Sequence, residues 1–129
     1  MQLLLDTTVL IDALRMRRGR RQLLADLIRA GHSLGTTALN IAEVYAGMRQ
    51  AEEVQTHAFL GALYCYDISG ETGRLAGKLK NEWAHKGKTL TLADTIIAAV
   101  ALERDCTLMT DNRKDFPMPE LKHYRLPSE

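Results

Sequence analysis

The stretch TLADTIIAAVALERDCTLMTDNRKDF, residues 91–116, decides the fold of this chain. It is apolar around most of its circumference between Ala93 and Leu102, which predicts a central helix that is buried on most sides. TLMT (residues 107–110) then predicts a short strand, and DNRKDFP (residues 111–117) predicts a polar loop. A buried helix that leads into a buried strand is typical of the α/β class, in which helices cover a sheet.

The rest of the chain continues this alternation. QLLL (residues 2–5) predicts a strand that ends at Asp-Thr-Thr, and VLIDAL (residues 9–14) has helical spacing. RQLLADLIRAG (residues 21–31) predicts an amphipathic helix with one apolar face, made of Leu23, Leu24, Leu27 and Ile28. Further strands are predicted at SLGTT (33–37), CYDIS (65–69) and HYRL (123–126), and further helices at residues 37–48, 51–64 and 71–87. Helices alternating with short strands predict an α/β fold with a mostly parallel sheet, formed by one domain that spans residues 1–129.

The composition is that of a globular protein. Hydrophobic residues make up 46% and charged residues 26% of the 129 positions, which is too apolar for a disordered chain. The N-terminus has no basic region and reaches Asp6 after three leucines, so it predicts neither a signal peptide nor a membrane span. We therefore expect a cytoplasmic protein that does not associate with membranes.

Positive charge is concentrated in two places, although the net charge is only +1. Five arginines occupy seven consecutive positions, and a thinner basic stretch follows later in the chain; the candidates are Arg15, Arg17, Arg18, Arg20, Arg21, Lys86 and Lys88. Either group could bind a phosphate backbone. The alternative for the arginines is a solvated turn between two helices, and the sequence leaves both interpretations open.

Two aspartates directly follow predicted strands. Asp6 ends the first strand and Asp111 follows TLMT. In a parallel sheet the loops at the carboxyl ends of the strands converge on one crevice, so both side chains face a single site if the two strands are neighbours. The alternative is that each aspartate only caps the helix that follows it.

Two further acids lie on predicted helices. Asp94 falls in the first turn of the most apolar helix, where a helix N-terminus offsets about 0.3–1 kcal/mol of a burial cost of roughly several kcal/mol; we therefore expect a cation near it. Glu43 lies among apolar residues with no basic residue three or four positions away on its helix. A solvated helix face is the alternative for Glu43.

A convergence of these acids is best explained by a divalent metal. Carboxylates that repel one another raise a pKa and destabilise the fold unless a cation lies between them. Oxygen ligands alone select Mg²⁺ or Mn²⁺, and the four histidines are isolated and lack zinc-like spacing. The sequence therefore predicts a carboxylate site suited to phosphate chemistry.

Three ordered blocks resemble a known family: LLLDTTVLIDAL (3–14), TALNIAEVYAGM (37–48) and LADTIIAAVALERDCTLMTDNRKDF (92–116). In their order and spacing they are similar to the PIN-domain ribonucleases, and among these to the VapC-type toxins of toxin–antitoxin pairs. The resemblance covers essentially the whole chain. It implies a Rossmann-like, three-layer PIN fold, endonucleolytic cleavage of RNA, a homodimer, and a separately encoded VapB-like antitoxin.

The resemblance also assigns site residues. It implies that Asp6, Glu43 and Asp94 form the metal-binding core for Mg²⁺ or Mn²⁺. The last family motif maps onto Thr110, Asn112 and Asp115, with Asp111 as an extra acid at a variable position, and the sequence leaves open whether Asp111 or Asp115 completes the pocket. Thr8 takes a position where the family often has Asn or Ser, and its hydroxyl is expected to bond Asp6 or a water.

Other functions fit the sequence less well. A receiver domain requires adjacent acids after the first strand and a late lysine, and a haloacid-dehalogenase-type phosphatase requires Asp-x-Asp there; Asp6-Thr7-Thr8 meets neither requirement. The remaining alternative is a catalytically inactive PIN fold that binds RNA or protein. No short motif identifies the RNA target.

Overall fold

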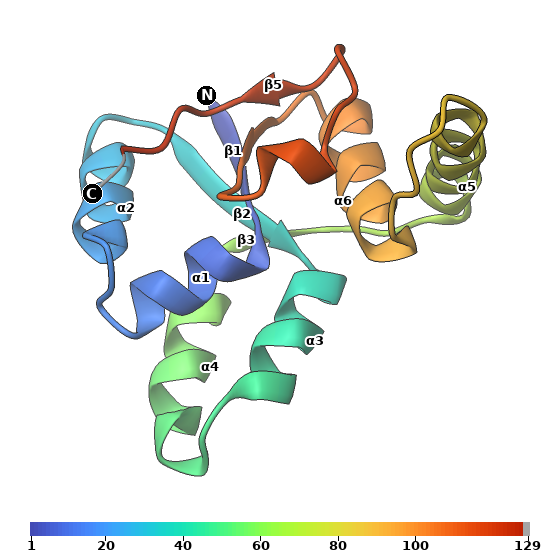
Figure 1. The fold of residues 1–129 in the computed structure, drawn as a ribbon. Coiled ribbons are helices and arrows are strands. Elements are labelled where there is room, and N and C mark those ends of the chain that lie inside the picture. Colours follow the sequence, from blue (N-terminus) through green and yellow to red (C-terminus); the bar gives the residue numbers. More distant parts are fainter. Residues whose placement is uncertain (128–129) are drawn as a thin grey trace.

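Five parallel strands form the centre of the computed structural model, which describes residues 1–127 (Figure 1). β1 (Gln2–Leu5) lies in the middle of the sheet, between β2 (Ser33–Thr37) and β4 (Thr107–Met109), and β3 (Tyr64–Tyr66) and β5 (Lys122–His123) are the edges. All four strand pairings are parallel, which confirms the predicted sheet. Residues 128–129 of the predicted domain lie outside the described residues.

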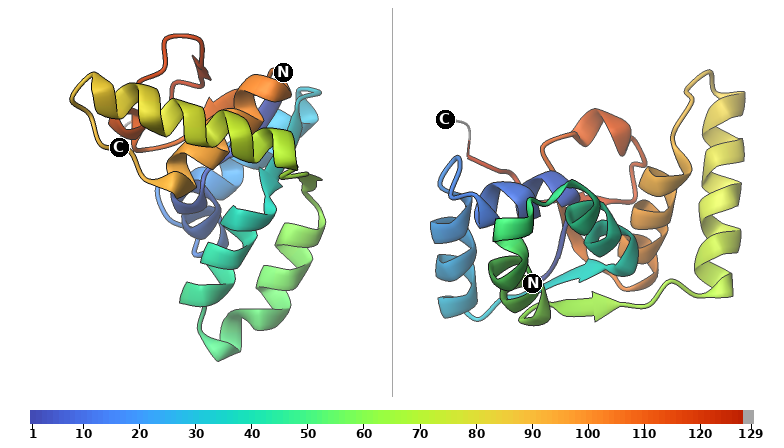
Figure 2. Two further views of the ribbon diagram at one scale, coloured as in Figure 1. Left: turned by 90° about the vertical axis from the view of Figure 1, so that its right-hand side faces the viewer. Right: turned by 90° about the horizontal axis from the view of Figure 1, so that it is seen from below.

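Helices cover both faces of this sheet and give the predicted three layers (Figures 1 and 2). One face carries α1 (Thr7–Leu14), α2 (Arg20–Arg29), α3 (Ala38–Gly47) and α4 (Glu53–Gly61). The other face carries α6 (Leu92–Glu103), with α5 (Gly70–His85) packed outside it. Two short 3-10 helices, η1 (Gln50–Glu52) and η2 (Arg113–Asp115), lie in the connections.

The alternation of side chains along β1 builds two hydrophobic cores. Leu3 and Leu5 pack toward α1 and α2, and Leu4 packs on the opposite face toward α6. All three leucines are fully buried. The prediction of a buried central helix is confirmed, because Ile97 and Val100 of α6 are also almost completely shielded from solvent.

The structure corrects three details of the sequence prediction. Ile28 was placed on the apolar face of α2, but it is 57% exposed, because the buried stripe of that helix is formed by Leu24 and Leu27. The last strand is the residue pair Lys122–His123 and not HYRL. The arginine segment is not simply a solvated turn, because Arg20 is only 1% exposed.

Helices α3 and α4 form a hairpin that extends away from the sheet (Figures 1 and 2). An ion pair of 3.1 Å between Arg15 Nε and Glu52 Oε2 ties this hairpin to the end of α1. Within residues 1–127, no helix has both the length and the apolar character needed to cross a membrane.

Candidate active site

The candidate site lies at the carboxyl edge of the sheet, between the two central strands. The chain crosses from β1 to one side of the sheet and later returns through β4 on its other side, so the strand order reverses between β1 and β4. Open α/β sheets bind their ligands at such a reversal, because the loops on the two sides diverge and leave a crevice. Asp6 follows β1 at this point and Thr110 follows β4, and the Asp6 amide donates a hydrogen bond of 3.0 Å to Met109 O.

Asp6 is held in one orientation by three donors. Its Oδ1 accepts hydrogen bonds from Thr7 N at 2.9 Å and from Asn40 Nδ2 at 3.3 Å, and its Oδ2 accepts one from Thr110 Oγ1 at 2.7 Å. The first of these makes Asp6 the N-cap of α1. Burial nevertheless raises the pKa of Asp6, and the charge of Glu43 adds to the increase. The Asp6 carboxylate is therefore well oriented, but its ionised form is disfavoured in the absence of a cation.

A polar chain links Asp6 to α3. Thr7 Oγ1 donates to Glu43 Oε1 at 2.7 Å and accepts from Asn40 Nδ2 at 3.0 Å. Thr37, the N-cap of α3, fixes Asn40 by donating from Oγ1 to Asn40 Oδ1 at 2.6 Å. Asn40 is fully buried, so its amide has a defined position between the two acids.

Sequence reasoning missed Asn40 and the role of Thr7. The available signal was an amide within an otherwise apolar helix, three residues after a capping threonine. Thr8 donates no hydrogen bond to Asp6 among residues 1–127, where the three donors to Asp6 are Thr7, Asn40 and Thr110; a bond from Thr8 to a water stays a prediction. Thr110 was expected to support the site, and it does contact Asp6.

Asp94 reaches the same site from the N-terminus of α6. Thr91 caps this helix by accepting a hydrogen bond of 3.1 Å from the Asp94 amide. Burial raises the pKa of Asp94, and the charges of Asp6, Asp115 and Glu43 raise it further. Asp94 on α6 therefore lies within electrostatic reach of three other acids, which follow β1 or lie on α3 and η2.

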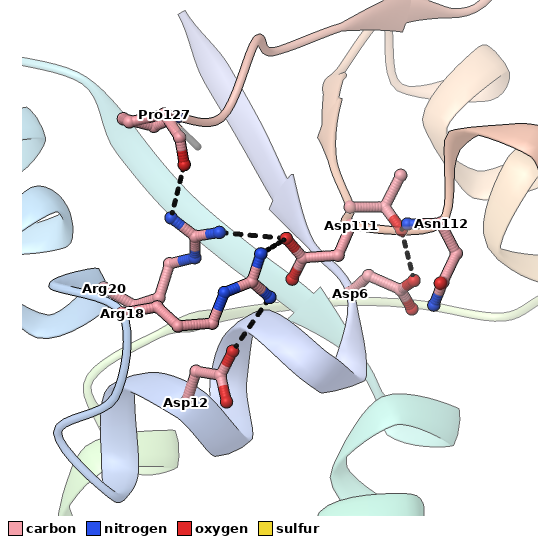
Figure 3. Close-up of polar contacts among 8 residues, drawn as sticks. Asp6, Asp12, Arg18, Arg20, Asp111, Asn112 and Pro127 are labelled. Atoms are coloured by element: carbon pink, nitrogen blue, oxygen red, sulfur yellow. Dashed lines mark hydrogen bonds and ion pairs between the residues drawn. The ribbon is translucent and has the colours of Figure 1, made fainter. Parts of the chain in front are cut away.

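Asp111 does not join this cluster. Its Oδ1 accepts from Arg20 Nη2 at 2.9 Å and lies 3.1 Å from Arg18 Nη2, and Figure 3 shows its side chain turned toward these two guanidinium groups. Asn112 contributes its amide N–H, which donates to Thr110 Oγ1 at 3.0 Å. Of the two acids that the sequence left open, Asp115 is therefore the one whose charge acts on Asp94, and Asp111 belongs to an arginine cluster.

The acids fit a hard divalent cation by their chemistry. Among residues 1–127, none of Asp6, Glu43, Asp94 and Asp115 forms an ion pair, so the cation expected near Asp94 is not supplied by the described chain. In the same part of the chain, no three His, Cys, Asp or Glu side chains are arranged closely enough to hold one ion together. Mg²⁺ commonly takes one or two carboxylates and keeps several waters, so it does not require a closed cage of protein ligands.

Most of the predicted RNA-binding residues have intramolecular partners. Arg21 donates to Ala13 O and Leu14 O, Lys88 Nζ donates to Lys114 O at 2.6 Å, and Lys86 Nζ lies 4.5 Å from the centre of the Trp83 ring. Arg15, Arg18 and Arg20 are ion-paired as described above, and Arg17 is exposed. The basic segment thus serves the fold to a larger extent than its sequence indicated.

Comparison with known proteins places this site in a family context. The PIN domain family matches residues 3–118. Ribonuclease VapC19 of Mycobacterium tuberculosis is 32% identical over 120 residues, which cover 92% of this chain and 96% of the relative. Ribonuclease VapC10 of the same species is 30% identical over 118 residues, which cover 92% of this chain and 88% of the relative.

Two solved structures are also similar. A toxin–antitoxin complex from Klebsiella pneumoniae contains a chain that is 28% identical, with a TM-score of 0.77 and coverage of 92% of this chain and 93% of that one. The crystal structure of VapBC2 from Rickettsia felis, bound to a promoter DNA fragment, gives a TM-score of 0.86 at 23% identity and covers 98% of this chain and 100% of that one. The latter likeness supports the fold.

Proposed function

Because this chain belongs to the PIN-domain family, we propose that it is a metal-dependent endoribonuclease and the toxin of a VapBC-type toxin–antitoxin pair. The observation that carries the proposal is the convergence of four carboxylates from four separate elements without an ion-pair partner among residues 1–127. Such a cluster is costly for an empty protein and becomes favourable when a divalent cation binds.

Asp6, Asp94 and Glu43 are the residues that would hold Mg²⁺, or Mn²⁺ in its place, directly or through water. When bound, the ion would polarise the phosphodiester and stabilise the charge on the leaving oxygen. Thr7, Asn40 and Thr110 keep the Asp6 carboxylate in place, because each of them donates a hydrogen bond to it.

The reaction we assign is hydrolysis of an RNA phosphodiester. A water oxygen forms a bond to phosphorus and the bond from phosphorus to the leaving ribose oxygen breaks. The water proton is lost to solvent or to a carboxylate, and the leaving oxygen gains a proton from solvent to become a hydroxyl. We assign Asp115 to orient this water, since it lies on η2 after β4 and its charge acts on Asp94. Asp111 has no part in the step, because two arginines hold it.

Similar structures support a proposal for the assembly of the protein. The Klebsiella pneumoniae structure is a toxin–antitoxin complex. We propose by analogy that this chain forms a homodimer and binds a separately encoded VapB-like antitoxin in the cytoplasm.

Cleavage of pooled total RNA by the purified, antitoxin-free protein tests the proposal. We expect discrete fragments in Mg²⁺ that disappear in EDTA and with Asp94→Asn, a substitution that keeps the size and shape of the side chain. Intact RNA from folded, Mg²⁺-loaded wild-type protein would instead favour an inactive PIN fold that binds RNA or protein.

A further inference from the structure

A second polar feature lies beside the four acids. A cleft of about 330 Å³ opens next to the loop that follows β4. Thr110 and Asp111 line this cleft together with four arginines. The arginines are Arg18, Arg20, Arg113 and Arg125. The carboxylate site described above does not use any of these arginines.

Arg20 gives the cleft a buried and rigid base. Its side chain is only 1% exposed, Nη2 donates to Asp111 Oδ1 at 2.9 Å, and Nη1 donates to Pro127 O at 3.3 Å (Figure 3). Its Nε is buried and has no hydrogen-bond partner among residues 1–127. Asp111 Oδ2 is likewise buried without a hydrogen-bond partner among the described residues, so both atoms are closed to solvent and the Arg20–Asp111 pair forms the wall of the cleft.

The cleft has a surplus of positive charge. Asp111 is the acid in its lining, and Asp12 also contacts Arg18, at 3.4 Å between Oδ2 and Nη1 (Figure 3). Arg113 and Arg125 are exposed and form no ion pair within residues 1–127. Two arginines are therefore neutralised and two remain available to an anion.

The cleft adjoins the carboxylate site through Thr110. Thr110 lines the cleft and also donates from Oγ1 to Asp6 Oδ2 at 2.7 Å. An RNA strand that places one phosphate at Asp6 carries its next phosphate one nucleotide away, so a further anion must lie near the site. Guanidinium groups match phosphate oxygens in geometry and bind them with two parallel hydrogen bonds.

We propose that this arginine cleft binds a backbone phosphate of the RNA next to the bond that is cleaved, an inference that rests on the proposed ribonuclease function. Arg113 and Arg125 contact the phosphate, while Arg18 and Arg20, paired with Asp12 and Asp111, form the wall of the cleft behind them. An RNA phosphate explains the cleft better than an acidic protein segment does, because the cleft directly adjoins the position that the scissile phosphate must occupy.

Salt dependence of RNA binding tests the proposal. The probe is a fluorescent single-stranded oligoribonucleotide, and Asp94→Asn is present in every protein so that the RNA stays intact. Arg113→Gln with Arg125→Gln should make the plot of log K against log salt less steep by roughly 0.7, the change expected for the loss of one phosphate contact on a single strand. Arg74→Gln on α5, which removes an exposed arginine on the other side of the sheet, should leave the slope unchanged.

A cleavage assay in the protein with native Asp94 distinguishes a failure of the phosphate site from a failure of the proposed ribonuclease function. We expect the double arginine variant to cleave a longer RNA more slowly than the wild type, and to lose less of its rate on a dinucleotide, because the dinucleotide has no second phosphate to bind. An unchanged salt slope, in a protein whose wild type cleaves RNA, would overturn the phosphate site and favour an acidic protein segment as the occupant. Failure of the wild type to cleave any RNA would overturn the proposed function instead.

Discussion

Asp111 shows how a single carboxylate can belong to the fold while it lies beside a catalytic site. Its side chain is 13% exposed and shares Oδ1 between Arg18 and Arg20. Asp111→Ala leaves the guanidinium of Arg20 buried without its partner, and removal of one member of a buried pair costs about 3–5 kcal/mol. We expect a loss of this size in urea unfolding.

A double variant provides the control for that prediction. Arg20→Met with Asp111→Leu removes both charges, and replacement of a whole buried pair by apolar residues is often neutral. It should recover most of the lost stability. If Asp111→Ala unfolds like the wild type but no longer cleaves RNA, Asp111 is a catalytic residue and its assignment here is wrong.

Asn40 is the residue whose importance only the structure reveals. It donates to Asp6 and to Thr7, and Thr7 in turn donates to Glu43, so Asn40→Ala removes the amide that links Asp6 to the acid on α3. Loss of such a supporting residue typically lowers metal affinity or activity by about 10–100-fold. We expect a higher Mg²⁺ concentration for half-maximal cleavage, with a smaller change in the rate at saturating Mg²⁺.

Thr8→Ala is the matched control for Asn40. Thr8 lies next to Thr7 in the first turn of α1 and makes no hydrogen bond to Asp6 within residues 1–127. Equal Mg²⁺ dependence of Asn40→Ala and the wild type would contradict a positioning role.

At the scale of elements, the close contact of β2 and β3 depends on Gly35. A Cβ at this position would lie 2.5 Å from Tyr66 Cε2 and 3.0 Å from the Tyr64 carbonyl oxygen, whereas a Cβ at Gly77 on α5 would meet nothing within 4 Å. Gly35→Ala should therefore destabilise the protein by about 1–3 kcal/mol. Gly77→Ala should stabilise it by about 0.5–1 kcal/mol. Opposite shifts in the chemical unfolding midpoint support this account, and a stabilising Gly35→Ala refutes it.

The elements themselves could largely be predicted from the sequence, and their polar contacts could not. The apolar circumference of residues 93–102 and the short apolar run QLLL follow directly from side-chain hydrophobicity, so α6 and β1 were recognisable. The partners of Arg20 lie 91 and 107 residues away, at Asp111 and Pro127. No local pattern encodes contacts of that kind, which is why the arginine segment resembled a solvated turn.

The same distinction applies to the site. Asp6 and Asp94 could be recognised in the sequence because a charged carboxylate beside apolar residues is costly to bury. Asn40 did not stand out, since a neutral amide in a helix carries no comparable penalty until its partners are known. The choice between Asp111 and Asp115 likewise required the path of the loop after β4.

At the scale of the whole molecule, the fold brings four acids to one edge of the sheet at a cost in stability. The pKa of Asp94 is raised, chiefly by burial, so its ionised form is less stable in the folded protein than in the unfolded chain. This penalty is absent below the ordinary pKa of aspartate, about 3.9, grows as pH rises through the folded pKa, and is complete above it.

Thermal unfolding in EDTA makes this cost visible. Asp94→Asn should have a higher Tm than the wild type at neutral pH, and the difference should shrink as the pH is lowered and Asp94 becomes protonated. Mg²⁺ should raise the Tm of the wild type by mass action and have a smaller effect on the variant. A variant that is less stable than the wild type in EDTA at every pH would show that Asp94 supports the fold by itself.

The most direct test of the central claim is the rate of RNA cleavage by three matched amide variants, measured in Mg²⁺ and in EDTA. We predict that the cleavage rate of Asp94→Asn and of Asp115→Asn falls by at least roughly 100-fold. The rate of Asp111→Asn in Mg²⁺ should remain close to that of the wild type, and EDTA should abolish cleavage by every protein. Cleavage that persists in EDTA, or that depends on Asp111 and not on Asp94, would contradict a metal-dependent ribonuclease built on these four carboxylates.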